Sequence, residues 1–174
     1  MELWKSIEPL AGKDVVNVII EISKGSKNKY ELDKKTGLIK LDRVLYSAMH
    51  YPLDYGLIPK TYCEDGDPLD ILVISTESLL PGVLVEARVI GAMRMIDSGE
   101  QDDKLIGVVA EDPRLNHIND IEDVGEHTLK EIRHFFEHYK DLQGKKVEVK
   151  EFLGKQQALK ILKDSISLYN QKFK

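Results

Sequence analysis

The strongest constraint on this chain is an acidic stretch that leads into an apolar run. Residues 64–70 read Glu-Asp-Gly-Asp-Pro-Leu-Asp and set four carboxylates among seven residues. Carboxylates held this close raise one another's pKa unless cations neutralise them. Gly66 lets the backbone bend and Pro68 fixes φ, so the stretch forms a rigid loop that enters a strand at residues 71–74. The pattern predicts a site for hard divalent ions such as Mg²⁺, Mn²⁺ or Ca²⁺, with Asp70 at the mouth of the strand.

Two other structures compete for this stretch. Turns favour Asp, Gly and Pro for backbone reasons, so residues 64–70 are also consistent with a solvated turn that has no chemistry. An EF-hand loop requires Gly at its sixth position and Glu at its twelfth, whereas this sequence has Asp70 and Thr76 there. The EF-hand is therefore excluded, and the turn remains open.

Most of the chain carries strand signals. Runs of β-branched and other apolar residues bounded by turn residues predict strands. The expected strands are residues 15–22, 29–32, 38–45, 71–75, 83–92, 105–110 and 146–152. Residues 46–59 are expected to be an aromatic, turn-rich connection, and residues 97–104 form a second acidic cluster. Two acidic loops joined by strands can meet at the same end of a barrel.

The strands at residues 29–32 and 38–45 predict a hairpin with a four-residue loop. By the two-residue period of a strand, Arg43 faces the same side as its apolar neighbours. These neighbours are Ile39, Leu41 and Leu45. A guanidinium there needs an anion, unless its long stem carries the head to solvent. Lys29 and Glu31 also share a face, either as a surface pair or as part of a charged pocket.

Two amphipathic helices are expected towards the C-terminus. Asp123 and Glu126 have the spacing of a capping box, which predicts a helix that begins there and ends before Gly144. Its apolar stripe consists of Leu129, Ile132, Phe136, Tyr139 and Leu142. A second helix is expected over residues 155–173. Its apolar side carries Leu159, Leu162, Ile166, Tyr169 and Phe173. Residues 1–13 are expected to form a short arm or helical turn.

Composition narrows the class of protein. With 174 residues, of which 42% are hydrophobic, one domain spanning residues 1–174 with one core is expected. The net charge of −5 argues against a nucleic-acid partner. No run of about 18 apolar residues and no signal-peptide core is found, so we expect no membrane association and a cytoplasmic location. Cys63 is the single cysteine, which rules out an internal disulfide.

The segment from His134 to His138 matches H-x-x-E-H, an inverted zinc-peptidase pattern. On a helical wheel both histidines, together with His127 and Asp141, fall opposite the apolar stripe. A zinc site needs an enclosed pocket, so this face is better interpreted as solvated or as a subunit contact. A zinc peptidase, a single-strand nucleic-acid binder and a calcium-stabilised structural module are the competing hypotheses.

Several blocks of this sequence together resemble the soluble inorganic pyrophosphatases of family I. The blocks are residues 65–71, Lys29-Tyr30-Glu31, Asp42-Arg43, Tyr51-Pro52-x-x-Tyr55-Gly56 and residues 134–142. They agree in order and spacing, and the match runs from about Val15 to the C-terminal helix. The resemblance implies a mainly β (α+β) fold, a five-stranded OB-like closed barrel with the two main C-terminal-half helices packed outside. It also implies a homohexamer.

The resemblance also implies residue roles. The activating Mg²⁺ ions would be bound by Asp65, Asp70 and Asp102, joined by Asp97 when further metal arrives with the substrate. Asp67 would take the proton from the attacking water. The two phosphates would be held by Lys29, Arg43, Lys104, Tyr139 and Lys140, with Tyr55 close to the metals and the nucleophile. The catalytic set is Asp67, Tyr55, Lys29 and Arg43, and the pocket is completed by Glu21, Glu31 and Tyr51.

The activity implied is Mg²⁺-dependent hydrolysis of inorganic diphosphate, that is pyrophosphate, to two orthophosphates. Several Mg²⁺ ions per active site are expected, and Mn²⁺ or Co²⁺ is expected to substitute for them. Cations are required because an anionic nucleophile cannot approach a compact polyanion until its charge is neutralised. The chain departs from the pattern at Ser98, where many bacterial members of the family carry a second acid after the residue that matches Asp97.

Overall fold

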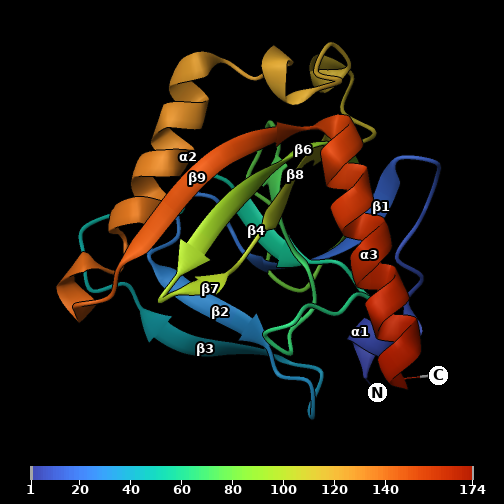
Figure 1. Cartoon of the computed structure of the whole chain (residues 1–174), viewed down its shortest axis with the longest axis horizontal. Coiled ribbons are helices and arrows are strands. Elements are labelled where there is room, and N and C mark those ends of the chain that lie inside the picture. Colours follow the sequence, from blue (N-terminus) through green and yellow to red (C-terminus); the bar gives the residue numbers. More distant parts are fainter. Residues whose placement is uncertain (1, 174) are drawn as a thin grey trace.

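The computed structural model describes residues 2–173 and is built mainly of strands, with two long helices outside them (Figure 1). The strands are β1 (Val15–Ile22), β2 (Asn28–Leu32), β3 (Ile39–Val44), β4 (Asp54–Leu57), β5 (Asp70–Ile74), β6 (Leu84–Asp97), β7 (Glu100–Gln101), β8 (Lys104–Val109) and β9 (Val147–Gly154). The helices are α1 (Leu3–Ser6), α2 (Glu126–His138) and α3 (Lys155–Phe173), with 3₁₀ turns at Pro113–Leu115, Ile121–Asp123 and Asp141–Gln143. Residue 1 of the expected arm lies outside the described residues.

Five strands pair into a closed ring. In order around the ring they are β1, β4, β5, β8 and β6, and β6 pairs again with β1. Closure leaves no unpaired edge between these strands, which is how a barrel protects its backbone groups. The ring is the five-stranded OB-like barrel that the sequence predicts. Strands β7 and β9 both pair with β6 outside the ring, while β2 and β3 form a separate two-stranded hairpin.

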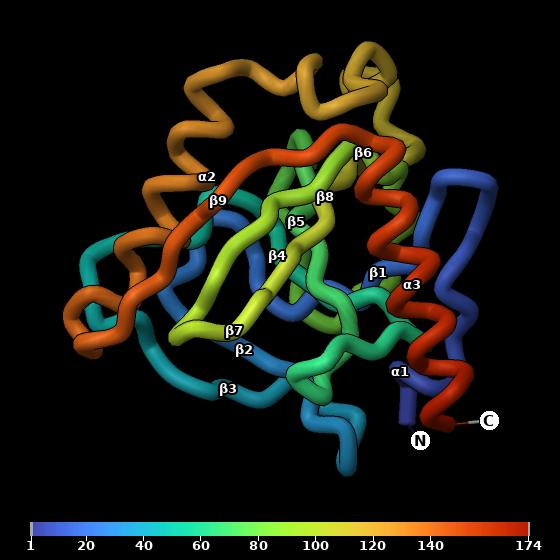
Figure 2. The backbone as a smooth tube through the Cα atoms, viewed as in Figure 1, coloured from blue at the N-terminus to red at the C-terminus, as the bar shows by residue number. Residues whose placement is uncertain are grey.

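Helices α2 and α3 cover the strands from outside. Helix α3 packs on β6 through buried Ala158 and Leu162, and α2 packs on β9 through Ile132 and Phe135. Figure 2 shows the two chain ends lying together, with α1 next to the last turns of α3. The contact is aromatic, because the Trp4 ring lies 5.8 Å from the Tyr169 ring. The helix predicted over residues 155–173 is confirmed in its bounds.

Two strand predictions were wrong. Strand β4 lies inside the segment expected to be irregular, and all four of its residues are buried. The sequence of residues 46–59 favours an irregular connection because the turn formers Pro52, Gly56 and Pro59 interrupt it. Strand β6 continues past Ala92 to Asp97, so Asp97 ends a strand instead of beginning a loop.

Gly56 explains how β4 fits between its neighbours. A Cβ atom at this position would lie 2.3 Å from the Ile19 carbonyl oxygen and 2.9 Å from a Val18 methyl carbon. Both atoms belong to β1, which pairs with β4 at this point. The close approach of two strand backbones therefore requires glycine at position 56.

Gly56→Ala is expected to lower the free energy of unfolding by about 2–3 kcal/mol, because the added methyl group must push β1 and β4 apart. Urea unfolding of the two proteins measures the difference. Gly12→Ala is the matched control, since a Cβ there meets only Val15 side-chain atoms at 3.4 Å or more. A Gly56→Ala protein as stable as the Gly12→Ala protein would contradict this account of β4.

The predicted capping box at Asp123 was wrong. The Asp123 carboxylate accepts hydrogen bonds from the backbone N–H groups of Asn119 and Asp120, at 2.8 and 3.0 Å, and so forms a capping box with Asp120 in the 3₁₀ turn Ile121–Asp123. Helix α2 begins at Glu126 with Gly125 at the N-cap. Leu142 also falls outside the helix and is 69% exposed, so it does not continue the apolar stripe. Phe135, which the predicted apolar stripe did not include, is buried in the helix.

No helix in the part of the chain that the structure describes is long and apolar enough to cross a membrane.

Candidate active site

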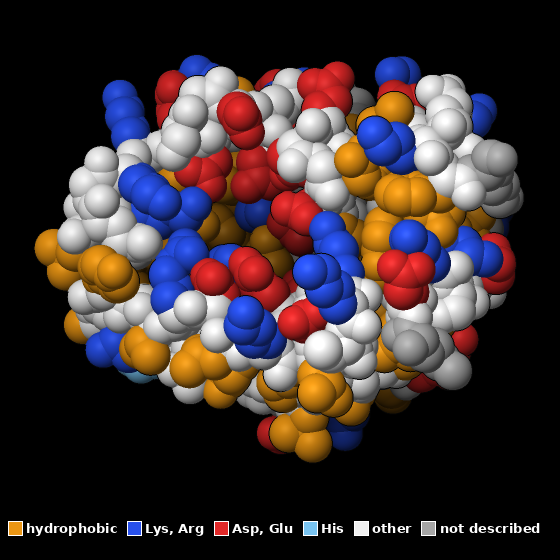
Figure 3. All heavy atoms as spheres, turned by 90° about the horizontal axis from the view of Figure 1, so that it is seen from below, with side chains coloured by type: hydrophobic (Ala, Val, Ile, Leu, Met, Phe, Trp, Pro, Cys, Tyr) orange, Lys and Arg blue, Asp and Glu red, His pale blue; other side chains and the backbone are white. Residues whose placement is uncertain are grey.

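The described residues form a pocket of about 580 Å³ between the barrel and the β2–β3 hairpin. The site residues predicted from the sequence that line it are Glu21, Lys29, Glu31, Tyr55, Asp65, Asp67, Asp70, Asp97, Asp102, Lys104, Tyr139 and Lys140. Figure 3 shows a hollowed face with Asp and Glu side chains and Lys and Arg side chains gathered around the hollow. The tertiary structure thus brings together residues as far apart in the sequence as Glu21 and Lys140.

Strand pairing sets the centre of the pocket. Strands β5 and β8 are parallel and begin side by side, so their first residues, Asp70 and Lys104, are register partners. The Lys104 ammonium donates to Asp70 at 2.8 Å and to Asp102 at 3.1 Å. Tyr55, from the adjacent β4, donates its hydroxyl to Asp70 at 2.5 Å. A lysine that is only 3% exposed is therefore held among acidic and phenolic oxygens.

The electrostatics of this cluster follow from burial and charge. Burial alone would lower the pKa of Lys104, but Asp70, Tyr55 and Asp102 together raise it well above its ordinary value. Burial raises the pKa of Tyr55, and neighbouring Asp70 adds to the effect. Lys104 is therefore a fixed cation and Tyr55 a fixed hydrogen-bond donor at neutral pH.

Glu21 lies at the back of the pocket as a buried carboxyl group. Burial, followed by the charge of Asp70, raises the pKa of Glu21 to about 8. Its Oε1 accepts a hydrogen bond from the Leu32 backbone N–H at 2.7 Å. Glu21 therefore ties the β2–β3 hairpin to β1, which places the hairpin over the pocket.

The acidic loop is folded by its own backbone. Gly66 has a φ of +90°, a conformation that suits glycine. The Asp67 N–H donates to Asp65 Oδ1 at 3.0 Å, and the Cys63 N–H donates to the Asp67 carbonyl. Burial raises the pKa of Asp65. Of the four acids in the loop, Glu64 alone is absent from the pocket wall and lines a neighbouring hollow of about 540 Å³.

The second acidic cluster contributes Asp97 and Asp102. Burial would raise the pKa of Asp97, but the Lys140 ammonium, which donates to it, lowers the pKa below its ordinary value. Burial raises the pKa of Asp102 despite the nearby Lys104. Ser98, where the family resemblance implies an acid, has a φ of +52° in the turn between β6 and β7. Its hydroxyl donates to Asp97 at 3.1 Å, so it supports that carboxylate by a neutral hydrogen bond.

The β2–β3 hairpin contributes Lys29 and Arg43 to this region. A bulge in β3 interrupts the predicted alternation of its side chains between the two faces. Lys29 pairs with Arg43 in the register, and a bulge leaves Asp42 without a partner opposite. Arg43 donates to Asp42 at 2.8 Å, Lys29 lies 3.5 Å from the same oxygen, and Lys29 also pairs with Glu31. The face predicted to be apolar is not uniformly so, since Leu41 is 47% exposed.

Two of the predicted site residues, Tyr51 and Arg43, are not among the residues that line the pocket. Tyr51 is 2% exposed and packs against the rings of Tyr55, Phe135 and Tyr139, at 5.8, 4.7 and 6.5 Å. Tyr51 therefore orients the two tyrosines that do line the pocket. Arg43 is not among the lining residues, and among the described residues its buried Nε has no hydrogen-bond partner.

The tertiary structure adds lysines to the site that no sequence pattern marked. Lys34, Lys35 and Lys40 belong to the hairpin and also line the pocket. The Lys34 ammonium lies 2.5 Å from Asp67 Oδ1. In the sequence, these three lysines are marked only by their place in the same predicted hairpin as Lys29 and Glu31.

The H-x-x-E-H segment forms no enclosed metal site. His134 and His138 lie on the exposed face of α2 with ring centroids 4.7 Å apart, and His138 Nδ1 lies 2.8 Å from Asp141. His127 is exposed on the same helix. Among residues 2–173, no three side chains of the metal-binding types His, Cys, Asp and Glu are grouped so that they could hold an ion in this conformation. The pocket carboxylates therefore line a wall and do not form a closed cage.

Comparison with known proteins agrees with this architecture. A family model described as inorganic pyrophosphatase matches residues 18–170. The inorganic pyrophosphatase of Geobacillus stearothermophilus is 54% identical over 157 residues, which cover 90% of this chain and 95% of that protein. Soluble inorganic pyrophosphatase 3 of Arabidopsis thaliana is 56% identical over 155 residues, which cover 89% of this chain and 72% of that protein.

Solved structures give the same result. The crystal structure of inorganic pyrophosphatase from Thermus thermophilus superposes with a TM-score of 0.94 at 50% identity, covering 98% of this chain and 99% of that chain. The inorganic pyrophosphatase of Helicobacter pylori superposes with a TM-score of 0.91 at 44% identity, covering 95% of this chain and 99% of that chain.

The fold shared with these relatives, and the activity for which they are named, define a hydrolase of a phosphoric anhydride, and the pocket of this chain joins acidic side chains to lysines. The chain belongs to the inorganic pyrophosphatase family. The zinc-peptidase, nucleic-acid-binding and calcium-module hypotheses are not needed to account for its site.

Proposed function

We propose that this chain hydrolyses inorganic diphosphate to two orthophosphates by direct attack of water, in a Mg²⁺-dependent reaction with Asp67 as the general base. The observation that supports this most directly is the composition of one pocket. Asp65, Asp70 and Asp102 line it together with Lys29 and Lys104. A site with both charges close together suits a polyanionic substrate that arrives with divalent cations.

The residues present fit Mg²⁺. Carboxylate oxygens are the hard donors that this ion prefers, and the pocket holds four suitable aspartates. They are Asp65, Asp70, Asp97 and Asp102, and they would hold the ions. Bound Mg²⁺ supplies neutralisation of phosphate charge and makes water more acidic. Burial raises the pKa of Asp65 and of Asp102, and a bound cation would favour their ionised form. Mn²⁺ or Co²⁺, which accept similar donors, would substitute.

The chain's own groups bind and orient the substrate. Lys29, Lys104 and Lys140 would act as point charges on phosphate oxygens, and Arg43, the register partner of Lys29 in the hairpin, as a planar fork. Tyr55 and Tyr139 would supply the phenolic hydroxyl groups that line the pocket. The Asp67 carboxylate would accept the proton of the attacking water from the open side of the pocket. Glu21, Glu31 and Tyr51 would hold these groups in place.

Phosphate release from pyrophosphate tests this function. We expect turnover with Mg²⁺, none with EDTA, and restoration when Mg²⁺ is returned in excess, because the ions neutralise the substrate. Colorimetric assay of orthophosphate gives the measurement. Inactivity with Mg²⁺ combined with peptide hydrolysis in Zn²⁺ alone would instead favour the zinc-peptidase hypothesis.

The proposal includes a single domain over residues 1–174 and a cytoplasmic location, both expected from the sequence pattern, and assembly as a homohexamer, which the family resemblance implies. The exposed histidine face of α2 is the candidate subunit contact. Sedimentation velocity would measure the mass of the assembly.

A further inference from the structure

Lys34 occupies a fixed place at the turn of the β2–β3 hairpin. The Asp33 carboxylate accepts hydrogen bonds from the N–H groups of Lys35 and Thr36, at 2.8 and 3.1 Å. The Gly37 N–H donates to the Asp33 carbonyl at 2.8 Å, and Gly37 has a φ of +73°. These bonds close the turn on itself, so the backbone of Lys34 is held even though the loop is on the surface.

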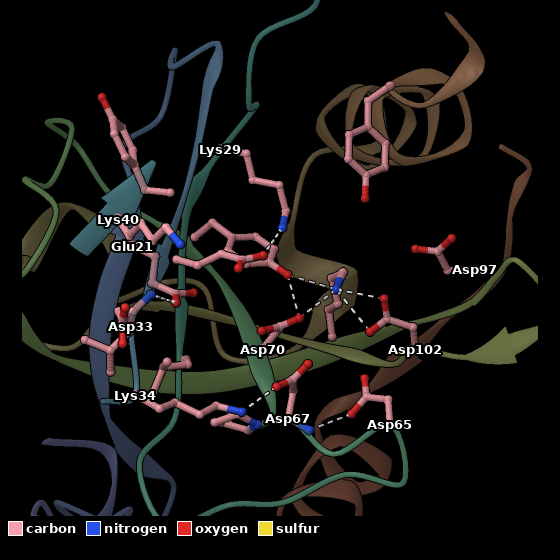
Figure 4. A pocket seen from close by; sticks show the side chains of 18 of the residues that line it. Glu21, Lys29, Asp33, Lys34, Lys40, Asp65, Asp67, Asp70, Asp97 and Asp102 are labelled. Atoms are coloured by element: carbon pink, nitrogen blue, oxygen red, sulfur yellow. Dashed lines mark hydrogen bonds and ion pairs between the residues drawn. The ribbon is translucent and has the colours of Figure 1, made fainter. Parts of the chain in front are cut away.

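The Lys34 side chain reaches the acidic loop. Its ammonium lies 2.5 Å from Asp67 Oδ1 and 3.4 Å from the Gly66 carbonyl oxygen, and Figure 4 shows Lys34 and Asp67 pointing toward each other. Within the described part of the chain, Lys34 is the only side chain that contacts the Asp67 carboxylate. The Asp67 side chain is 65% exposed, so without this contact it would be free to change rotamer.

Trp4 of the N-terminal arm contacts the Lys34 side chain. The Lys34 ammonium lies 5.4 Å from the centre of the Trp4 ring, within the range of a cation–π contact. Trp4 is 4% exposed, packs against Tyr169 and Phe173 of α3, and accepts a backbone hydrogen bond from Lys60 at 2.7 Å. The two ends of the chain therefore form a rigid base for Lys34, which gives the arm a structural role that its sequence did not show.

We propose that Lys34 is a positioning residue that holds the Asp67 carboxylate aimed into the pocket. This inference rests on the proposed role of Asp67 as the base. A pair this exposed contributes little to folding, so stability does not explain its geometry. Fixing the orientation of a base does affect rate, because a misplacement of about 1 Å costs up to about 10²-fold in turnover.

Lys34→Met keeps the length of the side chain and removes its charge. We expect kcat to fall about 10-fold, while KM for pyrophosphate and the urea unfolding midpoint stay close to wild type. Lys34→Arg restores a cation at the same place and should regain most of the rate. Lys27→Met is the matched control, because Lys27 is an exposed lysine just before the same hairpin that does not line the pocket, and its kcat should equal that of the wild type.

Asp67→Asn separates this inference from the proposed function. Because Lys34 acts through Asp67, Lys34→Met should lower kcat in the wild type and cause no further loss in an Asp67→Asn background. An equal further loss in that background, a raised KM with unchanged kcat, or an unchanged kcat in the single variant would each overturn the role of Lys34 and leave Asp67 as the base. Full turnover of Asp67→Asn by itself would instead remove the proposed base, and the role of Lys34 with it.

Discussion

Asp67→Asn is expected to lower kcat by about 10²–10⁴-fold, the range that a positioned general base contributes. The amide keeps the shape of the side chain but cannot accept the proton of water. Asp67 is the acid of residues 64–70 suited to this role, because its carboxylate is exposed, lines the pocket and contacts Lys34. Asp65 instead accepts the Asp67 backbone N–H, and Asp70 is half-buried against Lys104. Initial rates of phosphate release at saturating Mg²⁺ and pyrophosphate measure the loss.

Glu64→Gln is the control for this experiment. It removes one charge from the same loop at a position that does not line the active pocket, so its kcat should change little. Mg²⁺ should raise the melting temperatures of the Asp67→Asn protein and of the wild type equally, because Asp65, Asp70, Asp97 and Asp102 remain in both. If the Asp67→Asn protein turns over at the wild-type rate, another group is the base.

Lys104→Met is expected to lower the free energy of unfolding by about 3–5 kcal/mol at pH 7, the usual cost of removing one partner from a buried ion pair. The change leaves Asp70 and Asp102 beside each other without their shared cation. The pKa of Lys104 is raised in the folded state, so its contribution is fully present below the unfolded value of about 10.4 and is lost only at higher pH. Neutral pH therefore shows the whole effect. We also expect kcat/KM to fall by about 10–10²-fold, because a charged contact with phosphate is lost.

Urea unfolding with and without Mg²⁺ distinguishes this cause from a packing defect. A cation bound by Asp70 and Asp102 would compensate for the lost ammonium, so Mg²⁺ should stabilise the Lys104→Met protein more than the wild type. Lys160→Met is the control, because its pair with Asp164 is exposed and should contribute about 0.5 kcal/mol or less. Equal stabilisation of both proteins by Mg²⁺ would show that the lysine and the ion do not share these carboxylates.

Local patterns were sufficient where one periodicity governed a segment. Strand β1 and helix α3 matched their predicted bounds, because a β-branched run and an amphipathic repeat dictate their structures directly. Strand β4 was missed because its four residues are buried by β1 and β5 on either side, which only tertiary pairing shows. The start of α2 was misplaced because Asp123 caps a different turn. The first error comes from pairing between segments, which a local pattern does not contain. The second comes from a competing local cap, because Asp123 bonds the backbone of Asn119 and Asp120.

The sequence alone determined the kinds of side chain available and the family. The acidic loop, the hairpin cations and the tyrosines are fixed in type and spacing along the chain, and those spacings carry the family resemblance. The tertiary structure decided which charges meet. Parallel pairing of β5 with β8 buries Lys104 between Asp70 and Asp102, and the closed hairpin turn brings Lys34 to Asp67. Electrostatic energy depends on distance and on burial, and neither can be read from separation along the chain.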